Sequence, residues 1–162
     1  MSTLEVRSSS WSQGGAIPVQ HTCDGDNISP ELNWSEGPTG TQAYALICED
    51  PDAPIRTWYH WVIWNITDRQ LPEGVPPVAE VNSDYVQGRN SWSRYGYGGP
   101  CPPSGIHRYY FRVYALDSAL KALHGASAEQ LQEAMKGHVL AQGEIMGTYR
   151  RDPGAKRATA ER

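Results

Sequence analysis

Residues 42–50 read QAYALICED, and this run decides the fold class. The run is apolar at both alternating sets of positions until two acids and Pro51 end it, which is typical of a strand buried on both faces. Residues 58–66, WYHWVIWNI, repeat the pattern with aromatic and β-branched side chains. Residues 107–115, HRYYFRVYA, alternate instead, which indicates a strand with one buried and one partly exposed face. The three runs together predict a sheet.

One helix and a closing strand are predicted in the last third of the chain. Ser127 is the expected N-cap, Gln130 completes a capping box, and the apolar residues that follow recur at helical spacing. Gly137 is expected to end this helix. Residues 139–149 contain two glycines, which argue against a second helix, so we predict a strand there.

Length and charge limit the classes of protein to consider. A chain of 162 residues favours one domain, which we place at residues 1–151, and the polar residues 152–162 are expected to form a frayed tail. Acidic residues outnumber basic ones by 18 to 14, which argues against nucleic-acid binding. No run is apolar enough for a membrane span, and the first residues lack the features of a signal peptide. We therefore expect a soluble, cytoplasmic protein.

The composition favours loops, turns and reduced thiols. The chain has 16 glycines, 12 prolines and 6 tryptophans but one phenylalanine, which suits an all-β domain with long ordered loops. The three cysteines, Cys23, Cys48 and Cys101, cannot all pair within one chain. None lies in a CxxC pair or in a Cys/His array with zinc spacing, so we expect free thiols.

Two acidic clusters interrupt the strand pattern. Residues 23–30, CDGDNISP, superficially resemble a calcium loop but lack the ligand spacing and final glutamate of an EF-hand, so we interpret them as tight turns. Asp50 and Asp52 flank Pro51 where a buried strand ends. They could form a metal-binding or acid/base pair, or Asp50 could bind backbone amides while Asp52 pairs with Arg56 or another arginine.

Histidines and a rigid loop offer a different chemistry. His60 lies in an aromatic strand, where a histidine is more often a core residue than a ligand contact. Residues 97–105, YGGPCPPSG, combine glycines, which allow backbone N–H groups to approach a ligand, with prolines, which hold the loop rigid. His107 and Tyr109 share one strand face, whereas Arg108 should point away from it, toward an acid. Exposed amides, an imidazole and a phenol together favour an anion receptor.

These clusters resemble one family, the phosphatidylethanolamine-binding proteins, also called Raf kinase inhibitor-like proteins, in its bacterial and archaeal branch. The resemblance covers residues 17–151. It is carried above all by Asp50-Pro51-Asp52-Ala53-Pro54 followed, at the family's separation, by Gly105-Ile106-His107-Arg108-Tyr109. It implies a Greek-key β-sandwich of two antiparallel sheets, with one or two short helices in the C-terminal half and a small pocket at one end.

The resemblance also implies the residues of that pocket, which are Asp50, Asp52, Trp58, His60, Gly99, Pro100, His107 and Tyr109. It further implies a cis peptide bond between Ala53 and Pro54. The sequence departs from the family pattern at His21, Glu31 and Ser93. The polar tail has no counterpart of the helix that shields the pocket in animal members.

The leading functional hypothesis is a non-catalytic module that binds a small anion, such as phosphate, a phosphoryl head group, a phosphorylated side chain or a carboxylate. Asp50 would either hydrogen-bond a histidine and favour its charged form, or itself take up a proton when the ligand arrives. The expected donors to the anion are the amide of Gly99, the hydroxyl of Tyr109 and the imidazoles of His60 and His107. The alternative is a metal-assisted phosphoester hydrolase that uses the same aspartates and histidines. A third hypothesis is an inhibitor or scaffold that docks a protein partner at the pocket rim. No cofactor is expected, and monomer and homodimer both stay open.

Overall fold

The three apolar runs form neighbouring strands. They are β9 (Ile106–Leu116), β4 (Ala43–Asp50) and β5 (Trp58–Ile66), in that order in one sheet of a computed structural model that describes residues 2–121 and 123–151. β4 is buried along both faces, whereas β9 buries alternate residues. The sequence predictions for all three strands are therefore confirmed.

Seven strands make up the larger sheet, in the order β1-β10-β9-β4-β5-β8-β7. Its remaining members are β1 (Ser2–Thr3), β10 (Val139–Arg150), β8 (Tyr85–Gln87) and β7 (Glu80–Val81). β10 is the closing strand predicted at residues 139–149. Every pair in this sheet is antiparallel except β1 with β10, which are parallel. The expected arrangement of two antiparallel sheets is confirmed except for this pair. Parallel strands need a long connection, and most of the domain lies between β1 and β10 in the chain.

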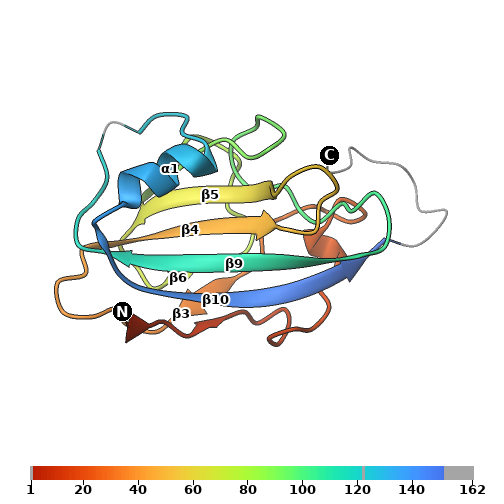
Figure 1. The fold of residues 1–162 in the computed structure, drawn as a ribbon, viewed down its shortest axis with the longest axis horizontal. Coiled ribbons are helices and arrows are strands. Elements are labelled where there is room, and N and C mark those ends of the chain that lie inside the picture. Colours follow the sequence, from red (N-terminus) through yellow and green to blue (C-terminus); the bar gives the residue numbers. More distant parts are fainter. Residues whose placement is uncertain (1, 122, 152–162) are drawn as a thin grey trace.

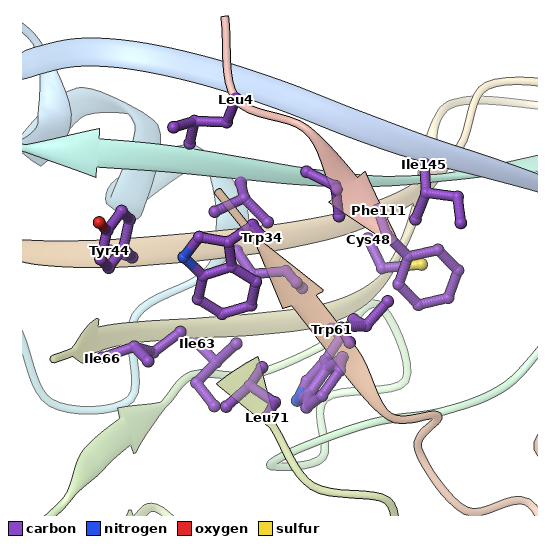
Figure 2. Close-up of a cluster of buried hydrophobic side chains, with 14 of the residues drawn as sticks. Leu4, Trp34, Tyr44, Cys48, Trp61, Ile63, Ile66, Leu71, Phe111 and Ile145 are labelled. Carbon is purple, nitrogen blue, oxygen red and sulfur yellow. The ribbon is translucent and has the colours of Figure 1, made fainter. Parts of the chain in front are cut away.

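A smaller sheet covers one face of the larger one (Figure 1). It contains β2 (Val6–Arg7), β3 (Leu32–Trp34) and β6 (Gln70–Leu71), in the order β2-β3-β6. The main core lies between the sheets, where Trp34 and Leu71 of the smaller sheet pack near Cys48, Trp61 and Phe111 of the larger one (Figure 2). Burial of these large apolar side chains holds the two layers together.

The opposite face of the larger sheet carries helix α1 (Ala128–Met135). Its predicted capping box is present: Gln130 N donates to Ser127 Oγ at 3.2 Å, and Ser127 N donates to Gln130 Oε1 at 2.9 Å. Leu131 and Met135 belong to a second buried cluster with Trp64 of β5. A 3-10 helix, η1 (Val19–His21), lies in the N-terminal half.

Two of the three cysteines are not reduced. Cys23 and Cys101 form a disulfide bond with an S–S distance of 2.06 Å, and only Cys48, buried in the core, is a thiol. The expectation of three reduced thiols was therefore wrong. The two bonded cysteines are separated by 78 positions, and only the folded chain brings the loop after η1 against the loop before β9.

The peptide bond between Ala53 and Pro54 is not cis, because the described residues contain no cis peptide bond. The expectation taken from the family resemblance was wrong at this position. Side-chain contacts hold the turn after β4: Asp52 N donates to Asp50 Oδ1 at 2.7 Å, and Arg108 N donates to Asp52 Oδ2 at 3.0 Å.

Within residues 2–121 and 123–151, no helix is long and apolar enough to cross a membrane. The cytoplasmic location stays a prediction. The Cys23–Cys101 disulfide bears on it, because in most organisms disulfide bonds persist mainly in oxidising compartments. The expected frayed tail at residues 152–162, and the comparison with the shielding helix of animal members, lie outside the described residues.

Reduction of the disulfide should lower the free energy of unfolding by about 2–4 kcal/mol, because the cross-link restricts the unfolded chain. The measurement is urea unfolding of the wild type with and without reductant. In the Cys48→Ala variant the effect of the reductant should persist, and in the Cys23→Ser/Cys101→Ser double variant it should vanish. Identical urea midpoints for the oxidised and reduced wild type would contradict this prediction.

Candidate functional site

A cluster of polar and aromatic side chains occupies the end of the sandwich where β4 stops. Asp50 is the last residue of β4 and lies on the same side as Leu46 and Cys48, so its carboxylate points toward the space between the sheets. His107 and Tyr109 lie on the inward face of β9, as predicted. Alternation along two antiparallel neighbours therefore brings an acid, an imidazole and a phenol to one end of the core.

A β-bulge adds His60 to this cluster. Cys48 is paired with Trp61 and Glu49 with Tyr59, so His60 is an extra residue between two ladder positions. A bulge of this kind re-aims a side chain. His60 is fully buried, and its ring lies 5.1 Å from that of Tyr109.

The central contact of the cluster joins Asp50 to His107. Nδ1 of His107 lies 2.5 Å from Oδ2 of Asp50, while Oδ1 of Asp50 accepts the bond from Asp52 N. Asp50 is 0% exposed and His107 is 6% exposed. Because an ionised carboxylate can only accept, this contact requires the proton on Nδ1 of the imidazole. Asp50 thus directs its charge to a histidine and a backbone amide inside the protein.

Aromatic rings surround His60 and fix its orientation. Nδ1 of His60 donates to the carbonyl of Gly98 at 2.6 Å, since a carbonyl oxygen only accepts. Trp92 meets the ring of His60 edge-on at 5.2 Å and that of Trp58 at 5.4 Å. The rings of His107 and Tyr109 stack at 6.4 Å. The imidazoles are therefore held by packing as well as by hydrogen bonds.

Trp92 was not among the predicted site residues. It lies in the loop before Tyr97, next to Ser93, where the sequence departs from the family pattern. Ser93 adopts a φ of +61°. Glycine adopts a positive φ more readily than serine does, so Ser93 is an unusual residue for this backbone conformation. The sequence signal for this loop was therefore the departure from the family pattern at Ser93, and it did not identify Trp92 as a site residue.

Gly99 does not offer its amide as expected. Gly99 N donates to Oδ1 of Asn27 at 2.8 Å, so its hydrogen is bonded within the protein. A Cβ atom at Gly99 would come within 2.1 Å of the carbonyl oxygen of His21, which shows why glycine is required. Pro100 is buried beside it, and its carbonyl accepts from Cys23 N at 3.1 Å. Both residues hold the loop in place against residues 21–27.

Asp52 is turned away from the cluster. Its carboxylate receives two side-chain bonds from Arg108, from Nε at 2.9 Å and from Nη2 at 2.8 Å. The hydrogen bond from Arg108 holds the pKa of Asp52 below its ordinary value, and burial opposes this effect. Of the two alternatives for these acids, the contacts match the one in which Asp50 accepts from a backbone amide and Asp52 pairs with an arginine. The expected direction of Arg108, toward an acid, is confirmed.

Residues 23–26 form turns, and Asp24, one of the two acids in residues 23–30, is bonded within the protein. Asp24 accepts from the hydroxyl of Tyr149 at 2.6 Å and from Nε of Arg151 at 3.2 Å. No group of three or more histidine, cysteine, aspartate or glutamate side chains in the described part of the chain is arranged to hold a metal ion. The interpretation of this segment as turns, not as a calcium loop, agrees with these contacts.

These features define a class of protein, a two-sheet β-sandwich with a buried Asp–His pair and an aromatic cluster at one end. The chain matches the model of the phosphatidylethanolamine-binding protein family over residues 7–150, and it belongs to that family. The match confirms the resemblance found in the sequence.

Relatives and solved structures agree. A UPF0098 protein of Methanothermobacter thermautotrophicus is 48% identical over 150 residues, covering 91% of this chain and 99% of that protein. A UPF0098 protein of Aquifex aeolicus is 47% identical, covering 92% of this chain and 90% of the other.

Two crystal structures have the same fold. A putative phosphatidylethanolamine-binding protein homologue from Chlamydia trachomatis is 41% identical with a TM-score of 0.84, covering 94% of this chain and 100% of its own. YbcL of E. coli, described as a new member of the mammalian family, is 32% identical with a TM-score of 0.84, covering 93% of this chain and 100% of its own.

The Asp52–Arg108 pair should make stability depend on acidity. Because the folded protein lowers the pKa of Asp52, the carboxylate stabilises the fold above the ordinary aspartate pKa of 3.8, and this contribution is lost as the pH falls through the lowered value. Urea unfolding of the wild type and of Asp52→Asn should differ at neutral pH, and the difference should shrink in acid. Asp84→Asn, at an exposed aspartate that forms no ion pair within the described residues, is the matched control. A difference that grows as the pH falls would contradict the assignment.

Proposed function

We propose that the protein is a non-catalytic module that binds a small anion, or the anionic group of a larger ligand, at the cluster of Asp50, His60, His107 and Tyr109. The observation that carries this proposal is the buried contact between Asp50 and His107. Suitable anions are phosphate, a phosphoryl head group, a phosphorylated side chain and a carboxylate.

The Asp50–His107 pair resolves the apparent conflict of a carboxylate beside an anion. Asp50 neutralises the positive charge of a protonated His107 from inside the protein, and it already accepts from Asp52 N. A protonated imidazole carries a second N–H at Nε2, and this group is the proposed donor to the anion. A bond from an ionised donor to an ionised acceptor is worth about 1.5–3 kcal/mol.

Exposure indicates where the ligand makes contact. Asp50, His60 and Tyr109 are each 0% exposed, whereas His107 is 6% exposed. The anion therefore first meets His107, and the hydroxyl of Tyr109 lies beside it on the same strand face. The donor set proposed from sequence is kept except for Gly99, whose amide is bonded to Asn27. A partner protein with a phosphorylated side chain would present the same chemistry, and an inhibitory role would act through it.

Replacement of His107 by alanine should weaken phosphate binding roughly five- to a hundredfold, a loss of about 1–3 kcal/mol. Calorimetry or NMR titration with inorganic phosphate, and then with acetate, measures the affinity.

His138→Ala is the matched control for this titration. His138 also bonds an aspartate, Asp117, with Nδ1 2.8 Å from Oδ1, but this pair is exposed and lies at the other end of β9. The control should bind phosphate as the wild type does. Equal affinity in His107→Ala and the wild type would exclude His107 from the site.

Removal of metal separates binding from the hydrolase alternative. If the pocket binds anions through imidazoles and a phenol, dialysis against a chelator should leave phosphate affinity unchanged. If a metal held by the aspartates and histidines activated water, chelation should abolish turnover of an aryl phosphate and Zn²⁺ or Mn²⁺ should restore it. Metal-dependent turnover in the wild type that is lost in an identically purified Asp50→Asn/His60→Ala variant would overturn the binding proposal.

A further inference from the structure

A hollow lies beside the anion cluster, lined by Trp92 and Gly98, which contact His60. It has a volume of about 730 Å³, within the range of about 300–1,000 Å³ usual for ligand sites. Its lining residues are Cys23, Asp26, Asn27, Pro77, Asn90, Trp92, Arg94, Tyr95, Tyr97, Gly98 and Gly99. We call this hollow the Trp92 groove. Asp50, His60, His107 and Tyr109 are not part of its lining.

One wall of the Trp92 groove is organised by Asn90. Oδ1 of Asn90 accepts from Trp92 N at 3.0 Å and from Arg94 N at 3.2 Å, and Nδ2 donates to the carbonyl of Gly96 at 3.0 Å. A Cβ atom on Gly98 would lie 2.6 Å from the ring of Trp92, so the loop backbone packs directly on that ring. The wall is therefore preorganised around one buried amide.

A second wall, formed by Cys23, Asp26 and Asn27, is held by a covalent bond and a hydrogen bond. Cys23 is bonded to Cys101, and Asn27 accepts from Gly99 N, so the segment that carries Asp26 is tied to the loop below the groove. Both walls are thus fixed before any ligand arrives, and ligand binding does not have to order them.

Three polar groups at the groove have no bonded side-chain partner within the described part of the chain. Nε1 of Trp92 is buried without a hydrogen bond. The carboxylate of Asp26 and the guanidinium of Arg94 both line the groove and are exposed, and neither forms an ion pair with a described residue. The groove therefore offers a negatively charged hydrogen-bond acceptor in Asp26 and a positively charged donor in Arg94, beside the ring of Trp92.

From these groups we infer that the Trp92 groove is a second binding site for a zwitterionic ligand the size of a di- or tripeptide. Its ammonium group would pair with Asp26, and its carboxylate would accept two hydrogen bonds from the guanidinium of Arg94. Its apolar part would pack on Trp92 and Tyr97. A ligand with one charge would pair with either Asp26 or Arg94 and would be repelled by the other. Asp26 in particular disfavours a phosphate dianion, which separates this site from the anion cluster.

The test uses the dipeptide Ala-Phe and the ¹⁵N-labelled full chain. Because Nε1 of Trp92 has no hydrogen-bond acceptor, its N–H resonance, assigned with Trp92→Phe, should shift and saturate on titration. Asp26→Asn and Arg94→Gln should each weaken the affinity by up to about fivefold, the range expected for exposed ion pairs. N-acetyl-Ala-Phe-amide, which lacks both charges, should bind more weakly than Ala-Phe.

Two control variants separate the Trp92 groove from the anion cluster. Arg56→Gln removes an exposed cation that lies 6.0 Å from the ring of Trp58, outside the groove lining, and should bind Ala-Phe as the wild type does. Read at the Trp92 N–H resonance, His107→Ala should give the same affinity for Ala-Phe, because His107 does not line the groove; binding of a carboxylate at the anion cluster is measured separately with acetate. The inference would be overturned by an unshifted Trp92 N–H resonance, by equal binding of the uncharged analogue, or by a loss confined to His107→Ala.

Discussion

The contact between Asp50 and His107 is the constraint on which the site end of the protein depends. It joins Asp50, one residue past the final ladder pair of Glu49 with Tyr110, to His107, which lies three residues from Tyr110 on the inward face of β9. A buried carboxylate without a partner would cost several kcal/mol, so the two strands have to meet in this register. The stacked ring of Tyr109 and the bulged His60 then take their places beside the pair.

Local patterns in the sequence were sufficient to predict the strands and the inward residues of β9. Alternation from His107 to Ala115 depends only on the two-residue period of a strand, and the capping box at Ser127 depends only on neighbours three residues apart. The acid and the histidine of the central pair were also predicted, because both stand where apolar strands begin or end. The family resemblance added His60, which its aromatic surroundings alone would have placed in the core.

Contacts between distant segments could not be predicted in the same way. The disulfide between Cys23 and Cys101, and the bond from Gly99 N to Asn27, need two loops that meet only in the folded chain. Asp52 was grouped with Asp50 because the two are near in sequence, yet the turn directs it to Arg108. In each case the composition identified a reactive group, while the tertiary structure chose its partner.

The disulfide also makes a closed covalent ring of residues 23–101. This ring contains β4, β5, β7 and β8 of the larger sheet, while β9 and β10 lie in the chain that follows it. The two halves of the larger sheet therefore meet along β4 and β9, between a cyclic part and a linear part of the same molecule. A single protease cut inside the ring, for example in the loop at residues 72–79, would open the backbone yet leave one covalent molecule that separates only after reduction.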